Sequence, residues 1–291
     1  MAPKPLVVIV GPTACGKTAL SVEVAKQCGG EIICADSRTI YKGMDIGTAK
    51  PSAKEQQGVT HWGLDLVEPG EYYSVSDFKN YAVQKISEIR GRGHVPFLVG
   101  GTGLYINSVI FDYKFGKPAE AKLRSKLQHM TLEQLHNHCL VNGIVLPENY
   151  KNKRYVIRSI EKNGEILQTQ DQLIDNCVVV GISTVREELR NRIAKRAENI
   201  FDSNVIDEAK FLSDKYGWDS EAMKSNVYPL IHQYLDETMS LKDIKEKFIV
   251  LDWRLAKRQL TWLRRNKFIH WLSLIDTQNY ILDQLAITEQ S

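Results

Sequence analysis

A phosphate-binding loop near the start of the chain constrains the fold more than any other feature. Residues 11–18 are GPTACGKT, which matches the spacing G-x-x-x-x-G-K-T. The apolar run LVVIV precedes this loop, and the helix-forming segment ALSVEVAKQC follows it. A glycine-rich loop between a buried strand and a helix is the setting in which this motif binds phosphate groups. The sequence therefore predicts a strand over residues 6–10, a helix over residues 17–27 and an α/β fold.

Further apolar runs alternate with helix-forming segments, which is typical of a parallel sheet. The segments EIICAD, HVPFLV and CVVVGIST are predicted strands, and the last of them rejoins the sheet late in the chain. Residues 76–90 have the apolar spacing of a helix that begins at Ser76 and Asp77. Parallel sheets bind ligands at the carboxyl ends of their strands. We therefore expect Asp36, which ends the second strand, to lie beside the phosphate loop.

The middle of the chain has a different composition. Residues 115–177 contain the basic, helix-forming segments AEAKLRSKLQ and NKRYVIRSIEKNG, without strong strands between them. This pattern predicts a small all-helical insertion domain over 115–177. It divides an α/β core that comprises 1–114 and 178–291. The end of the core is predicted to be mostly helical, through the segment WLRRNKFIHWL.

Composition limits the class of protein. The net charge of +3 and the 43% hydrophobic content are ordinary for a soluble globular chain, so they do not by themselves indicate a nucleic-acid binder. The five cysteines form no C-x-x-C pair, which argues against a zinc module or a disulfide framework. The segment HNHC is expected on a polar surface helix and not in a metal site. With no apolar run as long as a membrane span, we expect a soluble cytoplasmic protein.

The loop predicts which groups meet a phosphate. Gly11 and Gly16 let backbone N–H groups point at an anion, Lys17 adds a mobile positive charge, and the Thr18 hydroxyl can bind Mg²⁺. The strand FLVGGTG ends in glycines and a threonine, where a kinase would need a metal-holding carboxylate. Asp36 is the nearest acidic strand end, and it suits a metal ligand, a general base or a turn residue.

Several segments together resemble one enzyme family. GPTACGKT, ADSRTIYKGMDIGTAKP, HWGLDLVEP, YYSVSDF, PFLVGGTGLYI and RLAKRQLTWLR resemble the tRNA dimethylallyltransferase family in order and spacing, between Val7 and Leu272. DIGTAKP and VGGTGLY are far more specific than the phosphate loop. The resemblance implies a P-loop NTPase-like parallel sheet flanked by helices. It also implies that a dimethylallyl group passes from dimethylallyl diphosphate to the N6 amine of the adenosine 3′ to the anticodon in tRNA, with release of diphosphate.

The resemblance assigns roles to residues at matching positions. It implies that Asp36 is the general base, that Thr102 hydrogen-bonds the substrate near the reacting amine, and that Arg196 closes over the diphosphate. Diphosphate would be bound by Gly11, Pro12, Thr13, Ala14, Cys15, Gly16, Lys17 and Thr18, with Lys17 stabilising the departing charge and Thr18 holding Mg²⁺. The tRNA anticodon stem-loop would be bound by Asp36, Ser37, Arg38, Thr39, Thr102, Arg124, Arg154, Arg158, Arg254 and Arg258. We expect a monomer.

Two groups of basic residues allow more than one interpretation. From the residues alone, Arg192 and Arg196, four apart on one helix face, are better explained as solvated side chains than as ligands of a phosphate. The basic side of the last helix, with Arg254, Lys257, Arg258 and Arg265, is either a phosphate-binding surface or a solvated charged face.

The chain also departs from the pattern of the family. These positions are Asn152, Tyr155, Asn204, Val227 and Pro229, and they put the detailed tRNA contacts in doubt. The rival functions are an adenylate isopentenyltransferase acting on free AMP or ATP, a P-loop kinase of small molecules, and a nucleotide-gated RNA-binding module without chemistry.

Overall fold

The computed structural model describes residues 3–116, 120–162 and 172–290. It divides the chain into two compact units, Met1–Phe111 with Gln172–Ser291 and, separately, Asp112–Asp171. The smaller unit shares most of its residues with the insertion predicted over 115–177.

The larger unit contains a six-stranded sheet in which every neighbouring pair of strands is parallel. The strand order is β3-β2-β4-β1-β5-β6. The strands are β1 (Leu6–Val10), β2 (Gly30–Cys34), β3 (His61–Trp62), β4 (Val95–Gly100), β5 (Cys177–Ile182) and β6 (His270–Leu272). The predicted parallel α/β fold is confirmed, including the return of the chain to the sheet at β5.

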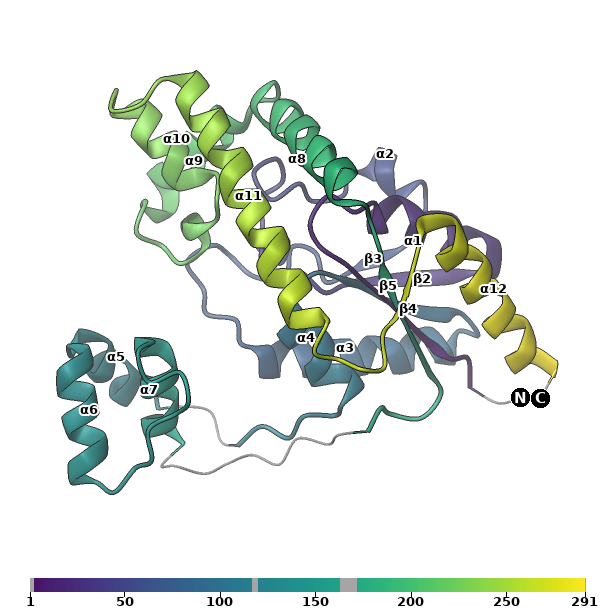
Figure 1. The fold of residues 1–291 in the computed structure, drawn as a ribbon, viewed down its shortest axis with the longest axis horizontal. Coiled ribbons are helices and arrows are strands. Elements are labelled where there is room, and N and C mark those ends of the chain that lie inside the picture. The colour runs from purple at the N-terminus through teal and green to yellow at the C-terminus, as the bar shows by residue number, and fades with distance from the viewer. Residues whose placement is uncertain (1–2, 117–119, 163–171, 291) are drawn as a thin grey trace. The chain divides into compact units, whose positions relative to one another are not determined.

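Helices cover both faces of this sheet. α1 (Lys17–Cys28) and α12 (Leu274–Gln290) lie on one side, and α3 (Val75–Gly91) and α4 (Gly103–Ile110) lie on the other (Figure 1). On the first side, alternate strand residues such as Val7 and Ile9 pack with Leu20 of α1 and Ile281 of α12. None of the helices in the described residues combines the length and apolar character that a membrane span requires.

Two local predictions were wrong. Helix α3 is capped by Ser74 and begins at Val75, not at Ser76, because Ser74 and Asp77 form a reciprocal capping box in which each side chain accepts the other's backbone N–H. The segment IHWL was predicted as helical, yet His270–Leu272 is strand β6. The preceding helix ends at Leu263, and these three residues then pair with the otherwise unpaired edge of β5.

A second core lies among the C-terminal helices α8 (Arg186–Phe201), α9 (Val205–Tyr216), α10 (Tyr228–Leu235) and α11 (Leu241–Leu263). It also contains Ile40, Tyr41 and Met44, which follow β2 in the sequence. The segment between β2 and the short helix α2 (Ala53–Gln56) is therefore held by helices from the far end of the chain.

In the smaller unit, the described residues form α5 (Ala121–His129), α6 (Leu132–Val141) and α7 (Lys153–Glu161) around a core that includes Leu135 and Val156. The segment HNHC lies on α6, as expected, and its Cys139 packs in that core. Across the residues that the structure describes, no cluster of three His, Cys, Asp or Glu side chains could hold a metal ion.

Candidate active site

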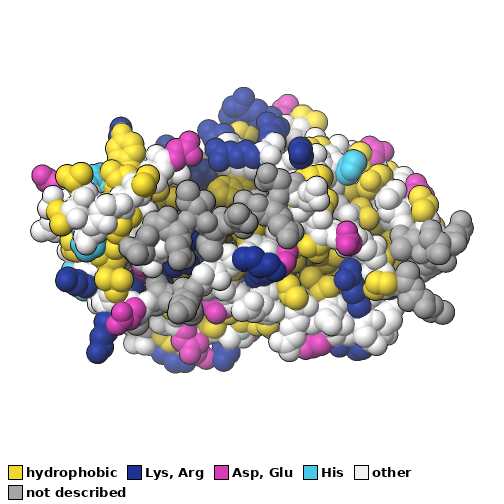
Figure 2. All heavy atoms as spheres, turned by 90° about the horizontal axis from the view of Figure 1, so that it is seen from below, with side chains coloured by type: hydrophobic (Ala, Val, Ile, Leu, Met, Phe, Trp, Pro, Cys, Tyr) yellow, Lys and Arg dark blue, Asp and Glu magenta, His cyan; other side chains and the backbone are white. Residues whose placement is uncertain are grey.

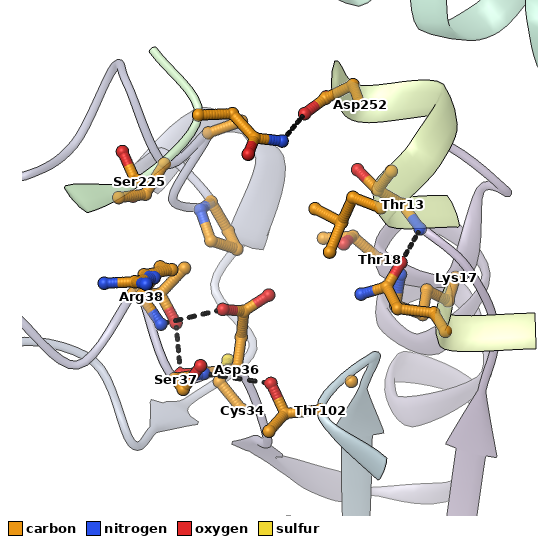
Figure 3. Close-up of a pocket in the computed structure, with 18 of the residues that line it drawn as sticks. Thr13, Lys17, Thr18, Cys34, Asp36, Ser37, Arg38, Thr102, Ser225 and Asp252 are labelled. Atoms are coloured by element: carbon orange, nitrogen blue, oxygen red, sulfur yellow. Dashed lines mark hydrogen bonds between the residues drawn. The ribbon is translucent and has the colours of Figure 1, made fainter. Parts of the chain in front are cut away.

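A cavity of about 380 Å³ opens at the carboxyl ends of β1, β2 and β4 within the larger unit. Its size is in the range of small-molecule sites. Figure 3 shows Asp36 facing Lys17 and Thr18 of the phosphate loop across this space. The residues predicted for the site that line it are Thr13, Lys17, Thr18, Asp36, Ser37, Arg38, Thr39, Thr102, Arg196 and Arg258.

The phosphate loop has the backbone conformation that an anion cradle requires. Ala14 and Gly16 lie in the left-handed region with φ of 62° and 96°, which turns the loop around a central space at the start of α1. The positive end of that helix favours an anion there. Lys17 Nζ donates to the Pro12 carbonyl at 2.9 Å, so the ammonium lies against the loop itself.

Three side chains from distant helices brace this loop. Arg192 Nη1 donates to the Cys15 carbonyl at 2.8 Å, and Arg196 Nη1 donates to Thr13 Oγ1 at 2.8 Å. The interpretation of both arginines as merely solvated is therefore wrong. Gln259 Oε1 accepts the Thr13 N–H at 2.8 Å, a contact that the sequence did not predict. The available signal was that Gln259 continues the inward-facing stripe of α11 that contains Ala256.

Asp36 forms a tight turn while leaving one oxygen open. Its Oδ1 accepts the Arg38 N–H at 2.8 Å, and Thr102 Oγ1 accepts the Ser37 N–H at 3.1 Å. Asp36 Oδ2 accepts no hydrogen bond from the described residues, and the side chain points into the cavity in Figure 3. Asp36 can therefore stabilise the turn through Oδ1 and still act as a base or a metal ligand through Oδ2.

Gly100, the last residue of β4, and Gly101 after it let the ends of β2 and β4 approach. A Cβ on Gly100 would lie 2.1 Å from the Ala35 carbonyl oxygen, and one on Gly101 would lie 2.4 Å from Gln259 Nε2. Gly100 has no room for a side chain, because the clash is with backbone, and a side chain at Gly101 would displace the Gln259 side chain that binds Thr13. This close packing is the physical reason for glycine in VGGTGLY, and it places Thr102 next to the turn that begins at Asp36.

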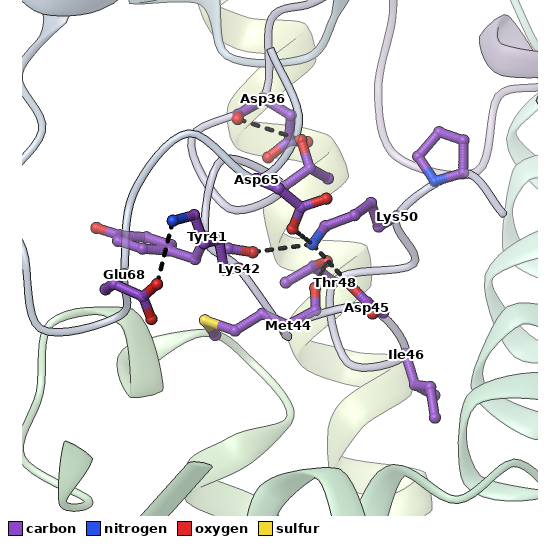
Figure 4. Close-up of polar contacts among 12 residues, drawn as sticks. Asp36, Tyr41, Lys42, Met44, Asp45, Ile46, Thr48, Lys50, Asp65 and Glu68 are labelled. Carbon is purple, nitrogen blue, oxygen red and sulfur yellow. Dashed lines mark hydrogen bonds and ion pairs between the residues drawn. The ribbon is translucent and has the colours of Figure 1, made fainter. Parts of the chain in front are cut away.

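The DIGTAK segment (residues 45–50) is fixed by two charged side chains. Glu208 on α9 accepts the backbone N–H groups of Asp45, Ile46 and Gly47 at 2.9, 2.7 and 2.9 Å. Lys50, whose side chain is 5% exposed, donates to Asp45, Asp65 and the Tyr41 carbonyl (Figure 4). The sequence did not reveal the role of Glu208.

That segment in turn forms one wall of the cavity. Thr48 and Ala49 line it, and the Thr48 carbonyl lies 3.4 Å from Arg196 Nη2.

Tyr228 also donates to Glu208, at 2.8 Å. Burial, followed by the nearby charge of Glu208, raises the pKa of Tyr228, so its hydroxyl remains a donor at neutral pH.

The thiol of Cys34 lines the same cavity but is unsuited to nucleophilic chemistry. Burial, and then the charge of Asp36, raise the pKa of Cys34 to about 12. The thiol therefore stays protonated at neutral pH.

A basic groove of about 550 Å³ runs along α11 beside the cavity. It is lined by Arg254, Lys257, Arg258, Thr261, Trp262 and Arg265, and Arg258 lines the cavity as well. Within the described residues none of its four cations takes part in an ion pair. Figure 2 shows one face of the molecule on which dark blue Lys and Arg side chains gather, while the Asp and Glu side chains are spread singly.

In contrast to the cations of the groove, two basic residues of the smaller unit form ion pairs. Arg124 pairs with the fully buried side chain of Glu161 through two hydrogen bonds, at 2.6 and 2.7 Å, and Arg158 donates to the same carboxylate at 3.1 Å. Part of the charge that was predicted to meet tRNA is therefore neutralised within the unit. Asn152, one of the departures from the family pattern, caps α7 by accepting the Arg154 N–H.

Two other departures have local explanations. Pro229 lies in the first turn of α10, where no N–H donor is needed. Val227 is fully buried in the second core, beside the position of Gly47.

Comparison with known proteins decides the family. Residues 39–266 match the family described as IPP transferase, and residues 4–66 match the family described as isopentenyl transferase. The chain belongs to the IPP transferase family. A tRNA dimethylallyltransferase of Desulforudis audaxviator is 39% identical, over 94% of this chain and 93% of its own length. One of Bacillus subtilis is 36% identical, over 93% and 91%.

A solved structure agrees with the assignment to the IPP transferase family. The tRNA isopentenylpyrophosphate transferase of Bacillus halodurans superposes with a TM-score of 0.75 at 35% identity, covering 99% of this chain and 98% of its own. A eukaryotic dimethylallyltransferase acting on tRNA has the same fold, with a TM-score of 0.77 at 21% identity. The family resemblance drawn from the sequence is confirmed.

Proposed function

We propose that this IPP transferase transfers the dimethylallyl group of dimethylallyl diphosphate to the N6 amine of the adenosine 3′ to the anticodon in tRNA. The observation that carries this proposal is that the phosphate loop and the open oxygen of Asp36 face one cavity. The loop would hold the diphosphate of the donor, and Asp36 would lie beside the acceptor amine.

The leaving group is stabilised by fixed positive groups. As the bond between the allylic carbon and the diphosphate oxygen breaks, the electron pair leaves with diphosphate. Loop N–H groups, Lys17 and Arg196 neutralise that charge. The Thr18 hydroxyl lines the cavity and has no partner among the described residues, so it suits Mg²⁺ bound together with phosphate oxygens. Bound Mg²⁺ would supply further charge stabilisation.

The acceptor amine needs a base because its lone pair is delocalised into the adenine ring. As nitrogen bonds to the allylic carbon, Asp36 Oδ2 takes the proton that the nitrogen loses. Thr102 lies at the end of the neighbouring strand, where its hydroxyl can orient the amine.

The RNA reaches this site through the basic side of the cavity. Arg258 belongs to both the cavity and the groove of α11, so a phosphate backbone in the groove lies next to the entrance. An adenosine inside an anticodon loop must leave its stack to enter a pocket. Arg38 and Thr39 line the space that would receive it.

The decisive experiment supplies labelled dimethylallyl diphosphate with tRNA, AMP and ATP in parallel reactions. We expect label in tRNA alone and no phosphoryl transfer from ATP. Asp36→Asn should lower the rate with saturating tRNA by about 100-fold or more, while tRNA affinity changes little.

The exposed carboxylate variant Asp214→Asn is the control. Label in AMP would favour an adenylate isopentenyltransferase, and ATP turnover would favour a kinase. If Asp36→Asn retained full activity, the role of Asp36 as base would be wrong.

A further inference from the structure

A buried carboxylate on α11 faces Arg196 at the wall of the catalytic cavity. The side chain of Asp252 is 4% exposed, whereas that of Arg196 is 27% exposed. Asp252 Oδ1 accepts a hydrogen bond from Asn226 Nδ2 at 2.8 Å, drawn as a dashed line in Figure 3. Its Oδ2 lies 3.5 Å from Arg196 Nε. Asn226 thus fixes the carboxylate so that the second oxygen faces the arginine.

This ion pair is not closed by a hydrogen bond. Within the described residues, neither Asp252 Oδ2 nor Arg196 Nε has a hydrogen-bond partner. The remaining nitrogens of Arg196 contact Thr13 Oγ1 and the Thr48 carbonyl. A buried carboxylate is costly unless it is paired, so the attraction to Arg196 compensates Asp252. No hydrogen bond has to break when another anion binds the guanidinium, but the buried Asp252 carboxylate then loses its compensating charge, so the two anions compete for Arg196.

The same pair weakens the attraction of the cavity for anions. Asp252 lines the cavity with Lys17, Arg196 and Arg258, and its negative charge offsets part of theirs. In the proposed reaction diphosphate is a product as well as part of the donor. A loop with all of its cations uncompensated would hold that product tightly and slow the next turnover.

We propose that Asp252 is a positioning residue that competes with bound diphosphate for Arg196. It keeps the guanidinium beside Thr13 before the donor binds, and it lowers the affinity of the loop for diphosphate so that the product leaves. The inference rests on the proposed function, because it takes the ligand of the loop to be diphosphate.

Pyrophosphate binding tests the inference without any turnover. The dissociation constant of pyrophosphate with Mg²⁺ is measured by calorimetry for the wild type, Asp252→Asn, Arg196→Gln and the double variant. We expect Asp252→Asn to tighten binding by about fivefold, the size of effect typical of a partly exposed ion pair. In the Arg196→Gln background the same change should tighten binding by at most about 1.5-fold, because its effect passes through Arg196.

Two controls keep the result interpretable. Glu246→Gln removes an exposed negative charge from the same helix and should leave pyrophosphate affinity unchanged. Thermal unfolding verifies that each variant is folded, and Asp252→Thr, which keeps a hydroxyl acceptor for Asn226, replaces Asp252→Asn if the latter does not fold.

Each other outcome contradicts the inference. Equal tightening in both backgrounds would mean that Asp252 repels diphosphate directly. Unchanged or weaker binding in Asp252→Asn would reduce Asp252 to a structural residue. If the wild type binds pyrophosphate but the cycle shows no coupling, only this inference fails. If the wild type binds no pyrophosphate, the proposed function fails with it.

Discussion

At the scale of single residues, carboxylates with the same chemistry do different work because of their neighbours. One oxygen of Asp36 accepts a hydrogen bond from the Arg38 N–H, and the other faces the cavity. Glu31, at the opposite end of β2, has both oxygens occupied. It accepts hydrogen bonds from Arg92 and from Trp62 Nε1, and it contacts His94 Nδ1. The first carboxylate is available for reaction, and the second stabilises the fold.

Glu31 gives a prediction about stability and pH. Burial alone would raise its pKa, but the hydrogen bonds from Arg92, Trp62 and His94 outweigh burial and lower the pKa from 4.5 to about 2. A lowered pKa stabilises the folded state above the unfolded value, and that contribution is lost as pH falls from about 4.5 to about 2. Glu31→Gln should therefore cost about 2–3 kcal/mol at pH 7.

Urea unfolding of the wild type and Glu31→Gln between pH 7 and pH 3 measures this contribution. The gap between the two free energies of unfolding should narrow as the medium becomes acidic. A gap that stays constant with pH would show that the charge of Glu31 is not its source.

At the scale of elements, the wall of the site depends on contacts between a loop and a helix that are far apart in sequence. Glu208 on α9 receives three consecutive N–H groups of the DIGTAK segment and the hydroxyl of Tyr228. Glu208→Gln replaces one of the two acceptor oxygens with an NH₂ group. That group would face backbone N–H or O–H donors, so at least one of these donors loses its acceptor. We expect a loss of about 1–3 kcal/mol in unfolding free energy.

Hydrogen exchange locates that loss. The amides of Asp45, Ile46 and Gly47 should exchange faster in Glu208→Gln than in the wild type. Dimethylallyl diphosphate should also bind less tightly to Glu208→Gln, because Thr48 and Ala49 of this segment line the cavity. The exposed neighbour Asp207→Asn, in the same first turn of α9, should change neither property. Unaltered protection of these amides in Glu208→Gln would refute the role of Glu208.

The helices and strands that the sequence predicts are those specified by local signals, and the ones it misses depend on distant segments. β1 and α1 follow from local signals: an apolar run, a glycine loop, and Gly29 at φ 63° to end the helix. Strands β3 and β6 have two and three residues, too few to show alternation, and exist because a longer neighbour offers an edge.

The hydrogen bonds that hold the walls of the site also cannot be predicted from local sequence patterns. Gln259 reaches Thr13 across 246 positions, and Glu208 reaches Ile46 across 162. Only the family resemblance indicated Arg196, since the spacing alone favours a solvated arginine.

At the scale of the whole molecule, the formal net charge of +3 understates how the chain can attract RNA. What matters is whether each cation is already neutralised. Arg124 and Arg158 share Glu161 within the smaller unit, whereas Arg254, Lys257 and Arg265 face the groove of α11 with no ion pair among the described residues. Unpaired cations release counterions when they meet phosphates, and that release makes affinity depend on salt.

This difference predicts how tRNA binding responds to ionic strength. Removing two groove charges, with Arg254→Gln and Lys257→Gln together, should reduce the slope of log affinity against log salt by about one per charge. The matched control, Lys242→Gln with Lys247→Gln, removes two charges from the other end of α11 and should leave the slope intact. Fluorescence anisotropy of labelled tRNA over a salt series measures both. Equal slopes for the two double variants would mean that overall charge, and not the groove, attracts the RNA.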